Sequence, residues 1–147
     1  MILVDSSVWI DYFNGHKTWQ TNLLDNLLSD VPIIIGDLIL AEILQGFRSD
    51  NDFESAKSYL SDLPFRQMGG YQVAVKSAQN YRILRKKGVT VRKTIDVIIG
   101  TYCILEGLPL LHDDRDFDPM GSHLSLKILS PEQTATAYFK IFSTATQ

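Results

Sequence analysis

The sequence contains little cysteine and no long hydrophobic run, and each absence excludes a class of protein. Cys103 is the only cysteine among 147 residues, so an internal disulfide is excluded and a reducing cytoplasm is the expected compartment. No run of about 18 or more apolar residues occurs, so we expect no transmembrane helix. The opening residues MILVDSSVW lack the basic and long apolar regions of a secretory signal, so we expect none.

Histidine and net positive charge are also scarce. The three histidines are far apart and the single cysteine stands alone, so no zinc-binding spacing exists. The net charge is −3, whereas nucleic-acid binders often carry a basic excess. The basic residues are nevertheless uneven, because six of the fourteen lie between residues 82 and 93: Arg82, Arg85, Lys86, Lys87, Arg92 and Lys93. We expect a basic rim beside an acidic site.

Short apolar runs alternate with longer amphipathic segments along the chain. The runs at 2–4, 33–35, 110–111 and 126–129 predict strands, with a weaker strand at 65–68. Continuous apolar runs favour strands that are buried on both faces of a parallel sheet. The length and a hydrophobic content of 45% predict one domain spanning residues 1–147.

Helices are predicted between these strands from apolar periodicity and from capping residues. The first predicted helix begins near Ser7, and the others cover about 18–29, 38–47, 53–62, 71–87 and 95–106, with a last helix that begins at 130–133. Asp37 and Thr94 are the predicted N-caps of the third and sixth helices. Gly88 and Gly107 are the predicted stops after 87 and 106. The alternation predicts an α/β/α sandwich with a mainly parallel sheet of four to five strands. Ligands of such sheets bind outside the carboxyl ends of the strands.

Three acidic residues occupy positions where a carboxylate is costly. Asp5 follows the first predicted strand, where an N-cap role would also explain it. Glu42 lies in LILAEILQG, a helix with little polar face, although a partly exposed interface position is the simpler alternative. Asp96 begins TIDVIIGTYCIL, an almost wholly apolar helix whose dipole alone would favour an early acid.

A fourth acidic region is the segment LLHDDRDFDP at residues 110–119. If the strand continues through it, Asp114 and Asp116 share one face and Asp113 faces the other way. Asp118 precedes Pro119, a common turn arrangement, and a solvated polar loop is the alternative for the whole segment.

Together these acids lie at one predicted edge of the sheet, and no histidine or cysteine accompanies them at zinc spacing. An all-carboxylate set suits hard cations, so the sequence predicts a Mg²⁺ site that also accepts Mn²⁺. Such ions bind phosphates and activate water for phosphodiester cleavage.

Four segments in this order resemble a PIN-domain ribonuclease of the VapC toxin type: MILVDSSVWIDYF, LAEILQG, KGVTVRKTIDVIIGTYCILEG and LPLLHDDRDFDPM. The resemblance implies a PIN-like fold and a Mg²⁺-dependent endoribonuclease, the toxin of a type II toxin–antitoxin system, whose products carry 5′-phosphate and 3′-hydroxyl ends. By matching motifs, the catalytic residues are Asp5, Glu42, Asp96, Asp114 and Asp116, and the metal ligands are Asp5, Asp96, Asp114 and Asp116. Ser6 matches the hydroxyl residue that supports a ligand or phosphate. Gly100-Thr101 departs mildly from the small alanines that relatives often carry after the third acid.

The resemblance also implies partners. These are an RNA substrate, a VapB-type antitoxin that lays an apolar segment in a groove, and a second copy of the chain in a homodimer. Arg92 and Lys93 are candidate RNA contacts, although a solvated helix end also explains the basic cluster. Trp9, Tyr12 and Phe13 line the antitoxin groove or belong to the core.

Two other classes of function are alternatives to the ribonuclease. A receiver or a haloacid-dehalogenase-like phosphatase needs a second acid near Asp5, and the phosphatase position is occupied by Ser7. A non-catalytic binding module with the same fold would have no need for the retained acids. Both alternatives are therefore disfavoured.

Overall fold

Four short strands form a parallel sheet in the order β3-β2-β1-β4. The computed structural model describes residues 1–132, and its strands are β1 (Ile2–Val4), β2 (Ile33–Gly36), β3 (Phe65–Arg66) and β4 (Leu110–Leu111). Ile2 pairs with Ile33, and Leu3 pairs with Leu110. Strands β1, β2 and β4 are buried along their whole length, which confirms the parallel sheet that continuous apolar runs predict.

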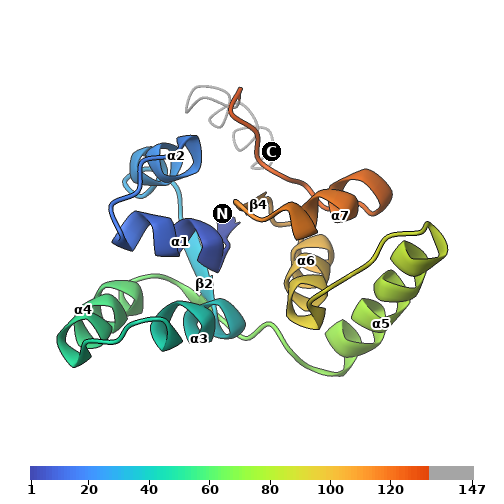
Figure 1. The fold of residues 1–147 in the computed structure, drawn as a ribbon, viewed down its shortest axis with the longest axis horizontal. Coiled ribbons are helices and arrows are strands. Elements are labelled where there is room, and N and C mark those ends of the chain that lie inside the picture. Colours follow the sequence, from blue (N-terminus) through green and yellow to red (C-terminus); the bar gives the residue numbers. More distant parts are fainter. Residues whose placement is uncertain (133–147) are drawn as a thin grey trace, which may run out of the picture.

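Helices cover both faces of this sheet. They are α1 (Ser6–Phe13), α2 (Trp19–Leu27), α3 (Asp37–Gln45), α4 (Asp50–Ser61), α5 (Tyr71–Lys86), α6 (Thr94–Glu106), the 3₁₀ helix η1 (Arg115–Phe117) and α7 (Asp118–His123). The crossovers from β1 through β2 to β3 carry α1–α4 on one face, and the return to β4 carries α5 and α6 on the other, as the general right-handedness of such connections requires. Figure 1 shows this division, with α7 on the side of α5 and α6. The predicted α/β/α sandwich is confirmed.

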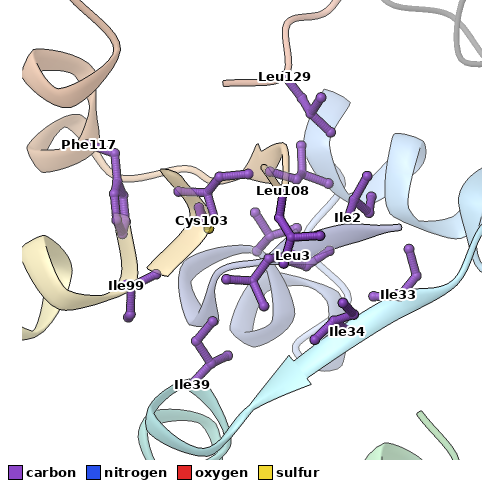
Figure 2. Packing of buried hydrophobic residues seen from close by; sticks show 14 of the residues in the cluster. Ile2, Leu3, Ile33, Ile34, Ile39, Ile99, Cys103, Leu108, Phe117 and Leu129 are labelled. Atoms are coloured by element: carbon purple, nitrogen blue, oxygen red, sulfur yellow. The ribbon is translucent and has the colours of Figure 1, made fainter. Parts of the chain in front are cut away.

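The core lies between the sheet and its two helical layers. Figure 2 shows the side chains of β1 and β2 in one cluster with Ile39 of α3, Ile99 and Cys103 of α6, and Phe117 of η1. Trp9 and Phe117 are among the largest fully buried side chains. Burial raises the pKa of the Cys103 thiol, so this cysteine is a packing residue rather than a nucleophile. Among the described residues, every helix is too short or too polar to traverse a bilayer.

Two predicted strands are shorter than expected. Residues 126–129 form only an isolated bridge from Ile128 to Leu110, because β4 itself offers two residues for pairing. Strand β3 ends at Arg66, and Met68 turns inward where its backbone N–H donates to Asp37 Oδ1 (3.0 Å). That hydrogen bond directs the chain away from the sheet, so the predicted strand at 65–68 covers two residues.

Most predicted helix starts lie within one residue of the structure, and α4 begins at Asp50 instead of residue 53. Asp37 is the first residue of α3 with Gly36 as its N-cap, and Thr94 is the first residue of α6 with Lys93 as its N-cap. Each predicted cap therefore lies one position inside its helix. Gly107 ends α6 in a left-handed conformation (φ 64°), as predicted. The described residues end at Glu132, so the helix predicted to begin at 130–133 lies outside them.

Close packing at Gly36 makes this position sensitive to a single methyl group. A Cβ atom there would overlap the sulfur of Met68, which is fully buried and held by its hydrogen bond to Asp37. We expect Gly36→Ala to lower the free energy of unfolding by about 1–3 kcal/mol through overpacking. Gly69→Ala is the matched control, because a Cβ at Gly69 meets no atom within 4 Å. Urea unfolding of the two variants measures the difference, and equal midpoints would contradict this packing account.

Candidate metal centre

Asp5 lies directly after β1 and directly before α1. Its Oδ2 accepts hydrogen bonds from the Ser7 backbone N–H (3.1 Å) and the Ser7 hydroxyl (2.7 Å), so Asp5 is the N-cap of the helix. Its Oδ1 is buried and accepts no hydrogen bond within residues 1–132. The side chain is 3% exposed, and burial raises the pKa of its carboxyl group, with a further contribution from Asp114. Capping therefore explains one oxygen of Asp5 and leaves the other without a partner.

Asp96 lies in the first turn of α6 and is also only 3% exposed. Its Oδ2 is buried without a hydrogen-bond partner in the described part of the chain. Burial, followed by the charges of Asp5 and Asp114, raises the pKa of the Asp96 carboxyl group to about 7. The helix dipole alone does not account for an acid so deeply placed, because a dipole would lower this pKa.

Glu42 projects from α3 and is half-buried. Its Oε1 is the third carboxylate oxygen that is buried without a partner among residues 1–132. Burial raises the pKa of Glu42 first and the charge of Asp5 raises it further, whereas a hydrogen bond from Ser6 and the charge of Lys93 lower it. Ser6, predicted to support a ligand, therefore contacts Glu42 in this structure.

Asp114 and Asp116 lie together for a different reason from the one the sequence predicts. Strand β4 ends at Leu111, so the strand alternation expected through residue 116 is wrong. Asp114 instead caps η1, and its Oδ1 accepts a hydrogen bond from the Asp116 backbone N–H (3.0 Å). Asp113 is exposed as expected, while Asp118 begins α7 rather than forming an isolated turn.

Three of these acids meet at one point. One carboxylate oxygen each from Asp96, Asp114 and Asp116 lies within 4.8 Å of the other two. Asp5 and Glu42 lie within electrostatic reach, because each raises the pKa of Asp96. Buried carboxylate oxygens without donors, gathered beside further acids, destabilise the protein unless a cation compensates them. The geometry and the all-oxygen donor set therefore fit a hard divalent cation.

Two basic side chains flank this cluster. Arg92 Nε lies 4.0 Å from Asp116 Oδ1, and the arginine side chain is 80% exposed. This ion pair is therefore weak, and another anion can replace Asp116 as the partner of Arg92. Lys93 lowers the pKa of Asp96 and of Glu42 by its charge. Both predicted RNA contacts thus lie at the rim of the acidic cluster.

Sequence reasoning missed two residues that position the acids. His112 is buried, and its Nδ1 accepts a hydrogen bond from the Asp114 backbone N–H (3.1 Å). Ser7 donates to Asp5 and accepts from the Asp113 backbone N–H (3.0 Å), so it joins the loop after β4 to the end of β1. No spacing in the sequence marks these contacts. A histidine immediately after an apolar strand and before the acids was the available clue.

Comparisons with known proteins identify the family of this fold. A family model described as PIN domain matches residues 2–121. The chain belongs to the PIN domain family. Its curated relatives place it among the VapC proteins: a VapC ribonuclease of Mycobacterium bovis and ribonuclease VapC11 of Mycobacterium tuberculosis are each 30% identical over 132 residues, covering 88% of this chain and 98% of the relative.

Solved structures of VapC proteins share the fold. VapBC2 of Rickettsia felis, bound to a promoter DNA fragment, matches with a TM-score of 0.71 and 19% identity over 88% of this chain and 98% of that chain. VapC20 of Mycobacterium tuberculosis, described as a toxin that cleaves the sarcin-ricin loop, matches with a TM-score of 0.63 and 16% identity over 82% and 95% of the two chains. These likenesses confirm the predicted PIN fold.

Proposed function

We propose that this VapC-type PIN domain, as a single domain, is a Mg²⁺-dependent endoribonuclease and the toxin of a toxin–antitoxin pair. The observation that carries the proposal is the meeting of Asp96, Asp114 and Asp116 near the buried Asp5 and the half-buried Glu42. The names of the curated relatives, which are VapC ribonucleases, support RNA as the substrate. A bound Mg²⁺ or Mn²⁺ would supply positive charge at the scissile phosphate and a water of lowered pKa.

We assign each acidic residue a role according to how deeply its side chain is buried. Asp96 and Asp114, with Asp5 beside them, hold the cation, since Asp96 and Asp5 are buried and retain oxygens without donors. Glu42 adds negative charge from the side of α3. Asp116 is half-buried at the rim, and we assign it the role of orienting the attacking water, with its backbone N–H already held by Asp114. Arg92 and Lys93 attract the phosphate backbone.

A VapB-type antitoxin fits the exposed side of α1. Trp9 is wholly buried, so it belongs to the core, whereas Tyr12 and Phe13 are half-buried and meet Tyr59 of α4 at 6.5 and 5.8 Å between ring centroids. Tyr59 itself is exposed. Solved VapBC complexes with this fold support an antitoxin as partner. We propose that the antitoxin covers these aromatic side chains, and that the toxin forms homodimers in the cytoplasm.

The test is metal-dependent cleavage by purified protein freed of antitoxin. We expect structured RNA to be cut with Mg²⁺ or Mn²⁺ and left intact with excess EDTA, because the carboxylates alone repel the phosphate. Mapping the RNA ends serves as the control against contaminating ribonuclease, which leaves cyclic phosphates instead of 5′-phosphate and 3′-hydroxyl ends. Cleavage that persists in EDTA and still leaves 5′-phosphate and 3′-hydroxyl ends would contradict the proposal.

A further inference from the structure

A groove of about 580 Å³ lies between α5 and α6. Its volume is within the range of small-ligand sites, and its walls are mostly apolar. Ala74 and Ala78 of α5 leave room that larger side chains would fill, and Val97 and Ile98 of α6 line the opposite wall. Figure 1 shows the two helices side by side on the same face of the sheet.

The polar lining of this groove favours an anion. Arg82 and Arg85 line it, and none of the residues that line it is acidic. Neither arginine forms an ion pair within residues 1–132. The guanidinium of Arg85 lies over the Tyr81 ring at 5.8 Å, so a flat cationic and aromatic surface faces the cavity.

A buried hydroxyl group in the groove also needs a partner. Ser77 is 5% exposed, and its Oγ forms no hydrogen bond with any described residue. A buried hydroxyl without a partner costs free energy, so a ligand or a water satisfies it. Apolar walls, one unsatisfied hydroxyl and two cations match a nucleoside with its phosphate, which offers a base to stack, groups to hydrogen-bond and a negative charge.

The groove and the proposed cleavage site share helix α6. Thr94, Val97 and Ile98 line the groove, and Asp96 lies on the other side of the same helix. Arg92 and Lys93 precede α6 and act on Asp116 and Asp96 respectively. Basic side chains therefore accompany both sites.

We propose that this groove binds one nucleoside of the RNA substrate, with its base between the apolar walls and its phosphate on Arg82 and Arg85. The inference rests on the RNA cleavage proposed above and names a second contact for the same substrate. A second copy of the chain fits less well, because a symmetric contact through this groove would bring cations against cations.

Paired variants separate this site from general electrostatic attraction. Affinity is measured by fluorescence anisotropy with short labelled single-stranded RNA of random sequence, in the Asp96→Asn background so that the probe stays intact. We expect Arg85→Glu to weaken binding about tenfold or more, and Lys86→Glu to weaken it about threefold or less. Lys86 is the matched control, because it has the same charge on the next residue of α5 but does not line the groove.

A second pair changes the shape of the groove without changing its charge. Ala78→Trp fills the cavity and is expected to weaken RNA binding about tenfold, whereas Gln79→Trp adds the same ring to an exposed neighbour outside the groove and leaves binding within about twofold. Circular dichroism melts of both variants show whether the fold is retained. Cross-linking of 4-thiouridine RNA to the peptide containing α5, followed by mass spectrometry, gives an independent readout that needs no variant.

The outcomes distinguish this inference from the proposed function. Equal losses for Arg85→Glu and Lys86→Glu, or unchanged binding by Ala78→Trp with no cross-link to α5, would overturn the nucleoside site while cleavage by the wild type stands. A change in oligomeric state by light scattering without a change in RNA affinity would show a self-association surface instead. Groove-dependent binding by a wild type that cuts no RNA would support the site and overturn the nuclease, and a wild type that binds no RNA would overturn both.

Discussion

Asp96→Asn is expected to reduce RNA cleavage at least about a hundredfold while the protein remains folded. Asparagine has the same shape as aspartate but removes the charge that faces Asp114 and Asp116 at the point where these acids meet. Because the metal-free carboxylate is buried without a donor, its neutralisation removes an unfavourable charge and raises the stability of the metal-free protein. Activity and metal-free stability therefore change in opposite directions.

The matched control for this variant is Asp113→Asn. Asp113 is exposed, lies one residue before Asp114, and contributes only its backbone N–H to the site, through Ser7 Oγ. Its replacement is expected to leave cleavage within about twofold, because an exposed charge is largely screened by solvent. The measurements are cleavage rates with saturating Mg²⁺ and thermal melts in EDTA. Full activity in Asp96→Asn would refute the assignment of the metal site.

The stability of the metal-free protein is expected to fall as the pH rises from about 5 to about 8. Burial and the neighbouring acids raise the pKa of Asp96 to about 7 in the folded protein, from 3.8 in the unfolded chain. Between these values the folded state binds the proton more tightly than the unfolded state, so the stabilisation is complete below the lower pKa and is lost as the pH rises through the upper one. At about 1.4 kcal/mol per pKa unit, the contribution of Asp96 is on the order of 4 kcal/mol.

His112 has the opposite pH dependence. Burial lowers its pKa, so the folded protein gains stability from this residue as the pH rises towards the ordinary pKa of histidine. Two comparisons separate the effect of Asp96 from that of His112. Asp96→Asn is therefore compared with the wild type at each pH by denaturant unfolding in EDTA, and the difference gives the part that belongs to Asp96. Added Mn²⁺ is expected to reduce or reverse the loss, because a cation binds the ionised carboxylates of the folded state only. A wild-type profile parallel to that of Asp96→Asn would contradict the buried-charge account.

The sheet and the positions of the acids follow directly from local sequence patterns. Uninterrupted apolar runs such as Ile2-Leu3-Val4 exclude a solvated face, which makes a doubly covered parallel strand the predictable outcome. Asp5 and Asp96 are recognisable because each interrupts an apolar context at a strand end or in the first turn of a helix. Such positions meet at the carboxyl edge of a parallel sheet whatever the details of the loops.

The details within that edge depend on contacts that have no local pattern. Asp114 and Asp116 lie together because η1 begins after β4 and Asp114 accepts the Asp116 N–H, a turn that the periodicity of a strand does not predict. The supporting contact from His112 likewise depends on a buried ring packed against Phe117, at 5.1 Å between centroids. The pairing of residues 126–129 stops at one bridge because its partner strand is so short.

The sequence by itself determined the order of β1–β4 and α1–α6 and predicted the acids of the site, because hydrophobic periodicity and capping act between residues that are close in the chain. It did not predict η1 or α7. The tertiary structure alone decided which oxygens remain without donors and that a cationic, apolar groove opens between α5 and α6. Both depend on burial and on distances between residues that are far apart in the chain, as with Ser7 and Asp113. Such distances are set only when both helical layers close over the sheet.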